Sequence, residues 1–201
     1  MENVFSIRLV DKKDAEGILG IYAPYVRDTI ISFEYDVPTL DAFSKRVENI
    51  SEEYPWVVCL LGDRIIGYAY AGLYRSRRAY QWGVESTIYM EESFHGRGIA
   101  RILDNTLISI LEFQGMLNIY AVISLPNEKS TGFHKSLGFS EIGIFKNVGY
   151  KFDSWHDVQW MDLYLGAHTG NPPKVNKWSL IRDSNEISLL LRNANLEFQK
   201  L

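Results

Sequence analysis

The chain has 201 residues, of which 46% are hydrophobic and 23% are charged, and its formal net charge is −4. These values are typical of one globular domain with a core of its own. The acidic balance provides no overall basic field, so we expect no nucleic-acid partner. We find neither a secretory-type N-terminus nor an apolar run of membrane-spanning length, so we expect no membrane partner.

The cysteine count bears on redox chemistry. The one cysteine, Cys59, excludes an internal disulfide and cannot hold a metal alone, so we predict no metal site and a reducing, cytoplasmic location. Cys59 lies inside an apolar run, which favours a buried side chain over a reactive one.

Hydrophobic periodicity predicts alternating strands and helices from the N-terminus to about residue 165. A strand over 6–10 precedes a helix capped by Asp11 or Asp14, which we expect to end or kink at Pro24. Thr39 is the expected cap of a second helix over about 40–50, and Gly62–Asp63 predicts a hairpin turn between strands at 56–61 and 64–74. The remaining expected elements are strands at 83–90, 118–124, 141–150 and 156–165 and helices at 99–111 and 126–137. This order predicts an α/β (α+β) fold with a mixed sheet and helices on both faces.

The last 35 residues have a different character. Residues 167–176 are typical of a linker, and Asp183 is the expected cap of an amphipathic helix that extends to the end of the chain. We therefore predict one domain over residues 1–166, followed by a linker and helix over 167–201. The apolar stripe of this helix must pack against its own domain, a second copy or another protein.

One stretch combines a strand, a glycine-rich turn and a helix start. The turn is His95-Gly96-Arg97-Gly98-Ile99-Ala100, and the following helix has an apolar residue every fourth position. Backbone N–H groups at such a turn suit a phosphate. The spacing fits neither a Walker loop nor a dinucleotide fingerprint, and a plain strand-to-helix turn is the simpler alternative.

This turn resembles the Q/R-x-x-G-x-G/A signature of the GCN5-related N-acetyltransferases (GNAT), with His95 at the first position. Further motifs resemble the phosphinothricin N-acetyltransferase branch, which includes the acetyltransferases of methionine sulfone, methionine sulfoximine and L-amino acids. They are YPWVV at 54–58, GYAY at 67–70, VESTIY at 84–89, LPN at 125–127, LGF at 137–139, GYK at 149–151 and WHD at 155–157. The resemblance covers residues 5–165 and implies the GNAT fold, with a mostly antiparallel sheet of six to seven strands. It also implies a homodimer.

By this resemblance the co-substrate is acetyl-CoA. The backbone of residues 88–90 would pair with the pantetheine arm. The glycine turn would bind the pyrophosphate, and Asn127 would contact the co-substrate or simply cap its helix. The implied acetyl-CoA site comprises Ile88, Tyr89, Met90, His95, Gly96, Arg97, Gly98, Ile99, Ala100, Arg101 and Asn127.

Acetyl transfer to an amine needs a base, because an amino acid's ammonium is mostly protonated at pH 7. Glu85 is our first candidate, and a solvent-facing or arginine-paired glutamate is the alternative. His134 is the second candidate, as a base or proton shuttle, against the alternative of a helix-surface histidine satisfied by solvent.

The resemblance also implies that the loop before residue 83 forms part of the binding site for the acceptor amine. Arg75 and Arg77 would hold the acid group of the substrate, although a solvated basic loop is an equal alternative. The implied acceptor residues are Phe33, Arg75, Ser76, Arg77, Tyr80, Glu85, Ser86 and Thr87.

From this resemblance we therefore predict an enzyme that acetylates the α-amine of a small amino acid or an analogue by direct transfer. Two alternatives stay open. One is an N-acetyltransferase for a polyamine, aminoglycoside or other small amine, and the other is a non-catalytic acyl-CoA-binding module.

Overall fold

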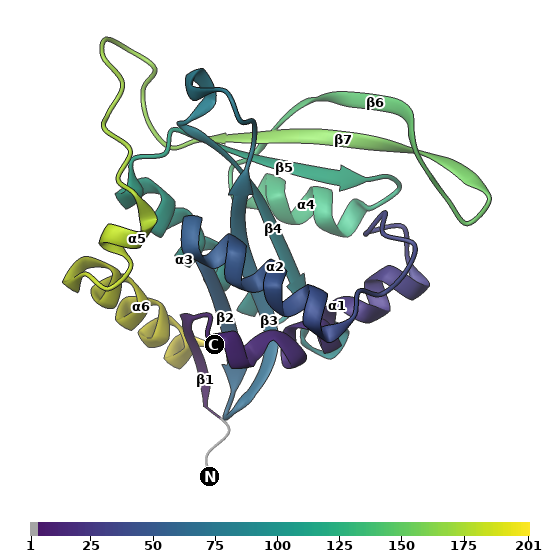
Figure 1. Cartoon of the computed structure of the whole chain (residues 1–201), viewed down its shortest axis with the longest axis horizontal. Helices are drawn as coiled ribbons and strands as arrows, with labels where there is room; N and C mark the ends of the chain where they lie inside the picture. The colour runs from purple at the N-terminus through teal and green to yellow at the C-terminus, as the bar shows by residue number, and fades with distance from the viewer. Residues whose placement is uncertain (1–3) are drawn as a thin grey trace.

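A computed structural model describes residues 4–201. Its centre is a seven-stranded sheet in the order β1-β2-β3-β4-β5-β7-β6, in which every neighbouring pair is antiparallel except β4 and β5 (Figure 1). The strands are β1 (Phe5–Leu9), β2 (Trp56–Leu61), β3 (Arg64–Leu73), β4 (Gly83–Met90), β5 (Asn118–Ser124), β6 (Ser140–Lys151) and β7 (Ser154–Tyr164). The mixed sheet and its strand number agree with the expected fold.

Helices cover both faces of the sheet, as expected. They are α1 (Ala15–Asp28), α2 (Leu40–Glu53), α3 (Ile99–Gln114), α4 (Glu128–Ser136), α5 (Trp178–Ile181) and α6 (Asn185–Glu197). On one face, α1 and α2 pack with Trp56, Val58 and Tyr68. On the other face, α3 and the C-terminal helices pack over alternate residues of the same strands, such as Val57 and Cys59. Strand alternation thus divides the core into two layers. None of the helices of residues 4–201 has the length and apolar character needed to cross a membrane.

Of the two outcomes expected at Pro24, an end of helix α1 is wrong, because the helix continues to Asp28. Pro24 and Gly20, whose carbonyl would have accepted the missing hydrogen bond, both lie on the exposed side, so water can replace that bond. Ile21 and Val26 are buried on either side of the proline, and this packing keeps the helix continuous. The cap of α2 is as expected, since Thr39 Oγ1 accepts from the N–H of Ala42 at 3.3 Å.

The C-terminal segment packs onto its own chain. Trp178, Ile187 and Phe198 are buried in the same core layer as α3. Asn195 extends its side-chain amide to the outer edge of β1, accepting from Ile7 N at 2.6 Å and donating to Ile7 O at 3.1 Å. This pair occupies an edge that would otherwise be open to another strand. The expected cap of α6 is wrong by one residue, because Ser184, not Asp183, accepts from Ile187 N.

Candidate active site

The parallel pair β4–β5 separates after three residue pairs. Pairing runs from Gly83 with Asn118 to Glu85 with Tyr120 and stops there. Beyond that point β4 remains paired to β3 and β5 remains paired to β7, so their facing edges diverge (Figure 1). The resulting gap holds a cavity of about 110 Å³, lined by residues 86–89 of β4, 121–124 of β5, and Asn127, Ser130 and His134 of the following segment. An extended ligand can add here as a strand would, between the two edges.

Two buried hydroxyls mark this gap as a place for a polar ligand. Ser86 Oγ and Ser124 Oγ are buried without a hydrogen-bond partner among the described residues, and both residues line the gap. A buried hydroxyl without a partner costs free energy, so such groups point to a missing partner. Ser124 was not identified from the sequence, because only the fold brings it opposite β4.

The glycine turn leads directly from β4 into α3. Gly96 and Gly98 have φ angles of +73° and +79°, in the left-handed region that disfavours other residues. Gly98 is the N-cap of α3, so the N–H groups of Ile99 and Ala100 lie at the positive end of the helix dipole. His95 is exposed and its Nε2 lies 3.1 Å from Met90 O, a carbonyl that also accepts from Tyr25 Oη. This geometry suits an anion such as a pyrophosphate.

The arginines of the turn are engaged elsewhere. The Arg97 guanidinium lies over the Phe94 ring, 5.3 Å from its centroid. Arg101 donates to Ser136 O at 3.0 Å and to Ser136 Oγ at 2.7 Å, so it ties α3 to the end of α4. An exposed lysine that the sequence analysis did not select, Lys129, lines the same groove as Met90 and His95. Its position at the start of α4, next to Asn127, is a signal that could have identified it.

Glu85 is the last residue of β4 that pairs with β5. It is half-buried, and burial raises the pKa of its carboxyl, while the nearby Arg75 acts in the opposite direction. Strand alternation puts it on the same face as Thr87 and Tyr89, as expected. The Tyr89 ring packs among Tyr22, Tyr25 and Tyr68, so it belongs largely to the core.

His134 is buried rather than on the helix surface. Its Nδ1 lies 2.8 Å from Ser130 O, and this contact assigns the proton to Nδ1 and leaves the Nε2 lone pair available. Burial lowers the pKa of the imidazole, which therefore favours the neutral form. Asn127 caps α4 by accepting from Ser130 N at 3.1 Å, and it also lines the gap.

The predicted acceptor arginines lie on the loop between β3 and β4. Arg75 places its guanidinium 5.2 Å from the Tyr74 ring centroid and 5.4 Å from that of Tyr80. It is close enough to Glu85 to affect the pKa of that carboxyl. Ser76 and Arg77 are exposed beside it. The loop thus brings Arg75 and Tyr80 to the Glu85 side of the sheet.

Phe33 lies on the loop between α1 and α2, against the β6–β7 hairpin. Its ring covers Gly149, where any Cβ would lie 2.2 Å from the ring, and it stacks on His156 at 6.2 Å. Lys151 holds the same loop by donating to the carbonyls of Val26, Thr29 and Ser32 at 2.6, 2.8 and 2.7 Å. The hairpin therefore fixes the conformation of the loop that carries Phe33. No group of three or more His, Cys, Asp or Glu residues within 4–201 is arranged to hold a metal ion.

The fold and this site define an acetyltransferase. The family model described as the acetyltransferase (GNAT) domain matches residues 7–160, and the chain belongs to this family. The expected family and fold are thereby confirmed.

Individual members of this family that are similar to the chain include acetyltransferases of amino-acid analogues. The chain is 33% identical over 152 residues to a phosphinothricin N-acetyltransferase of Streptomyces viridochromogenes, covering 76% of this chain and 83% of that protein. It is 32% identical to an L-methionine sulfoximine/L-methionine sulfone acetyltransferase of Pseudomonas paraeruginosa, with 83% and 98% covered. Among solved structures, a phosphinothricin acetyltransferase of Sinorhizobium meliloti in complex with acetyl-CoA superposes with a TM-score of 0.82 at 29% identity, covering 90% of this chain and 100% of that one.

Proposed function

We propose that the protein transfers an acetyl group from acetyl-CoA to the α-amine of a small amino acid or amino-acid analogue. The observation that carries the proposal is the position of Glu85. This half-buried carboxyl, whose pKa is raised by burial, stands where β4 and β5 begin to diverge. A base at this point can accept a proton from an amine that meets a thioester held in the gap.

The residues of the site fit acetyl-CoA, which supplies the thioester-bound acetyl group. The glycine turn and the first N–H groups of α3 offer a cradle for the pyrophosphate. The facing edges of β4 and β5 offer strand-like pairing for the pantetheine arm, and Ser86 and Ser124 offer hydroxyls without partners among the described residues.

Two groups share the proton chemistry in this proposal. Glu85 removes the proton from the attacking ammonium, directly or through a water. His134, with Nδ1 held by Ser130 O, presents Nε2 as a second base or a shuttle. Transfer is direct, since the only thiol is Cys59, which is buried and whose pKa is raised to about 12.

The acceptor's acid group is assigned to Arg75 with Arg77, because a guanidinium fork suits a carboxylate, phosphinate or sulfone. The names of the relatives support this substrate class, since phosphinothricin, methionine sulfone and methionine sulfoximine are amino-acid analogues.

The test measures thiol release from acetyl-CoA with phosphinothricin, methionine sulfone, methionine sulfoximine and the twenty amino acids. We compare the wild type, Glu85→Gln, His134→Asn and the exposed control Glu112→Gln. Loss of about 10²-fold or more in kcat for Glu85→Gln alone supports Glu85 as the base. Activity that survives Glu85→Gln but not His134→Asn transfers that role to His134.

The same assay separates the alternatives. Turnover only with polyamines or aminoglycosides would show that the acceptor is another small amine and not an amino acid. Saturable CoA binding without turnover on any amine would favour an acyl-CoA-binding module.

We also propose a cytoplasmic homodimer that associates through the β6–β7 hairpin. This hairpin extends from the body of the molecule (Figure 1). Large apolar side chains on it are exposed. Examples are Phe145, Phe152 and Trp155, with 57%, 55% and 61% of their surface exposed. An exposed apolar set of this kind favours a protein interface. Sedimentation analysis tests the proposal, and Trp155→Glu is expected to shift a dimer to monomer. A monomeric wild type would refute it.

A further inference from the structure

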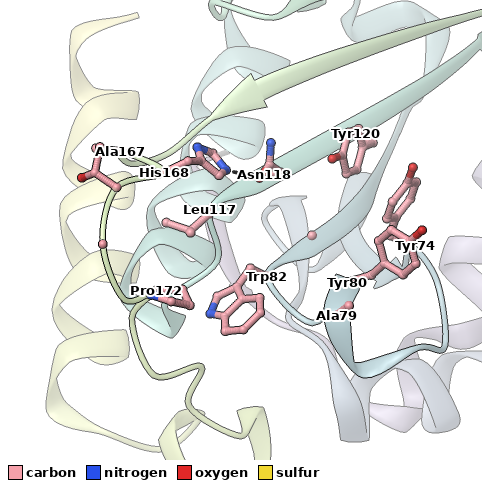
Figure 2. Close-up of a pocket in the computed structure, with 13 residues that line it drawn as sticks. Tyr74, Ala79, Tyr80, Trp82, Leu117, Asn118, Tyr120, Ala167, His168 and Pro172 are labelled. Atoms are coloured by element: carbon pink, nitrogen blue, oxygen red, sulfur yellow. Dashed lines mark hydrogen bonds between the residues drawn. The ribbon is translucent and has the colours of Figure 1, made fainter.

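A second pocket lies on the Glu85 side of the sheet, at the start of β4 and β5 (Figure 2). Its volume is about 250 Å³. One wall is aromatic and consists of Tyr74, Tyr80 and Tyr120, and the chain segment 167–172 lies across from it, with the Trp82 ring beside Pro172 (Figure 2). We call this segment the strap. The family model ends at residue 160, before the strap begins.

The strap is held in place along its length. Before it, Leu165 N donates to Leu117 O at 2.9 Å, and within it His168 Nε2 lies 2.7 Å from Asn118 Oδ1 (Figure 2). After it, Trp82 Nε1 donates to Pro173 O at 2.7 Å. These bonds fix the strap as a wall, so the pocket exists before any ligand binds.

The pocket continues the proposed acceptor site. Gly83, which lines it, lies two residues before Glu85 on the same strand face, and Tyr120, which also lines it, is the register partner of Glu85. Gly83 leaves room here, since a Cβ would lie 3.1 Å from the Tyr120 ring. Arg75 lies over the Tyr74 and Tyr80 rings of the aromatic wall. An amino acid with its amine at Glu85 and its acid group at Arg75 therefore directs its side chain into the pocket.

We propose that this pocket is the side-chain subsite and that the acceptor is an α-amino acid with an aromatic side chain. The inference rests on the proposed function and names the substrate class of that site. Edge-to-face and offset contacts with the tyrosine and tryptophan rings favour an aromatic group. The volume accepts such a group, whereas the short side chain of alanine leaves the pocket unfilled.

The experiment compares kcat/KM for phenylalanine, tyrosine and tryptophan with values for alanine and methionine sulfone. The wild type is expected to prefer the aromatic acids over alanine by at least about tenfold. Thr169→Trp fills the pocket from the strap and is expected to reduce the aromatic-to-methionine-sulfone ratio about tenfold, mainly through KM. Asn171→Trp is the matched control, because Asn171 belongs to the strap but does not line the pocket. Its ratio is expected to equal that of the wild type.

Melting temperatures with and without CoA confirm that each variant folds, and Thr169→Leu replaces Thr169→Trp if the latter is destabilised. Equal efficiency for aromatic and small acceptors, or a ratio unchanged by Thr169→Trp, overturns the subsite and leaves the proposed function standing. Lack of transfer to every amino acid overturns both.

Discussion

Asp104 makes the stability of this protein depend on pH in an unusual direction. It lies on α3 with 1% of its surface exposed, and its Oδ2 has no partner among the described residues. Burial raises the pKa of its carboxyl from 3.8 to about 7. Between these two values the folded state keeps a proton that the unfolded state has released, so the free energy of unfolding falls as the pH rises. The contribution is fully present below pH 3.8 and is lost by about pH 7.

The size of the effect follows from the two pKa values. Asp104 is expected to remove roughly 2–3 kcal/mol of stability between pH 5 and pH 8. Asp104→Asn keeps the shape of the side chain and cannot ionise. Urea unfolding of both proteins at pH 5, 6, 7 and 8, followed by far-UV circular dichroism, gives the difference directly, because all other groups are shared. The variant is expected to gain stability relative to the wild type as the pH rises. A difference that stays constant with pH would show that Asp104 has a charged partner or access to water.

Other residues give further tests. Gly96→Ala is expected to weaken the CoA-induced rise in melting temperature. The control Gly62→Ala, at a similar positive φ of +60° in the β2–β3 turn, is expected to lower the melting temperature without changing that rise. An equal CoA-induced rise in the two variants would contradict the anion cradle at Gly96. Lys151→Met removes the three hydrogen bonds that the Lys151 ammonium donates, and urea unfolding is expected to show a loss of about 3 kcal/mol of stability. Because these bonds hold the loop that carries Phe33, steady-state kinetics are expected to show a higher KM for the acceptor. Cys59, whose pKa burial raises to about 12, is expected to react with a thiol reagent at pH 8 only after unfolding, and rapid labelling of the native protein would refute its burial.

Local sequence patterns predicted most of the fold. Apolar periodicity, together with helix caps and turn residues, located every strand of the sheet and the helices α1 to α4. The glycine turn was also readable, since its positive φ angles at Gly96 and Gly98 restrict the residue type. A helix end at Pro24 was wrong because the rule for proline is local, whereas the packing that keeps α1 continuous is not.

The candidate site depends on features that no local pattern encodes. The sequence identifies a strand at residues 83–90, but only the register shows that its pairing with β5 ends at Glu85. The burial of His134 likewise depends on how α4 packs against β5 and Phe139. The sequence alone therefore left open a solvent-exposed histidine, and the three-dimensional structure excludes it. The dependence of Phe33 on Lys151 joins residues more than a hundred positions apart. These relations are tertiary, and sequence spacing does not determine them.

The strap illustrates how a segment outside the family's common core can affect its chemistry. The proposed catalytic groups, Glu85 and His134, lie within the matched region 7–160, and the strap does not. Because α6 packs on α3 and β1, the strap that leads to it passes beside Asn118 and Trp82, where it forms a wall of the pocket. The proposed transfer chemistry therefore lies within the matched region, whereas the proposed acceptor pocket combines residues of that region with the strap. If the proposal holds, substitutions of the strap residues that line the pocket change which amino acid is acetylated, whereas substitutions at Glu85 change how fast any of them is acetylated.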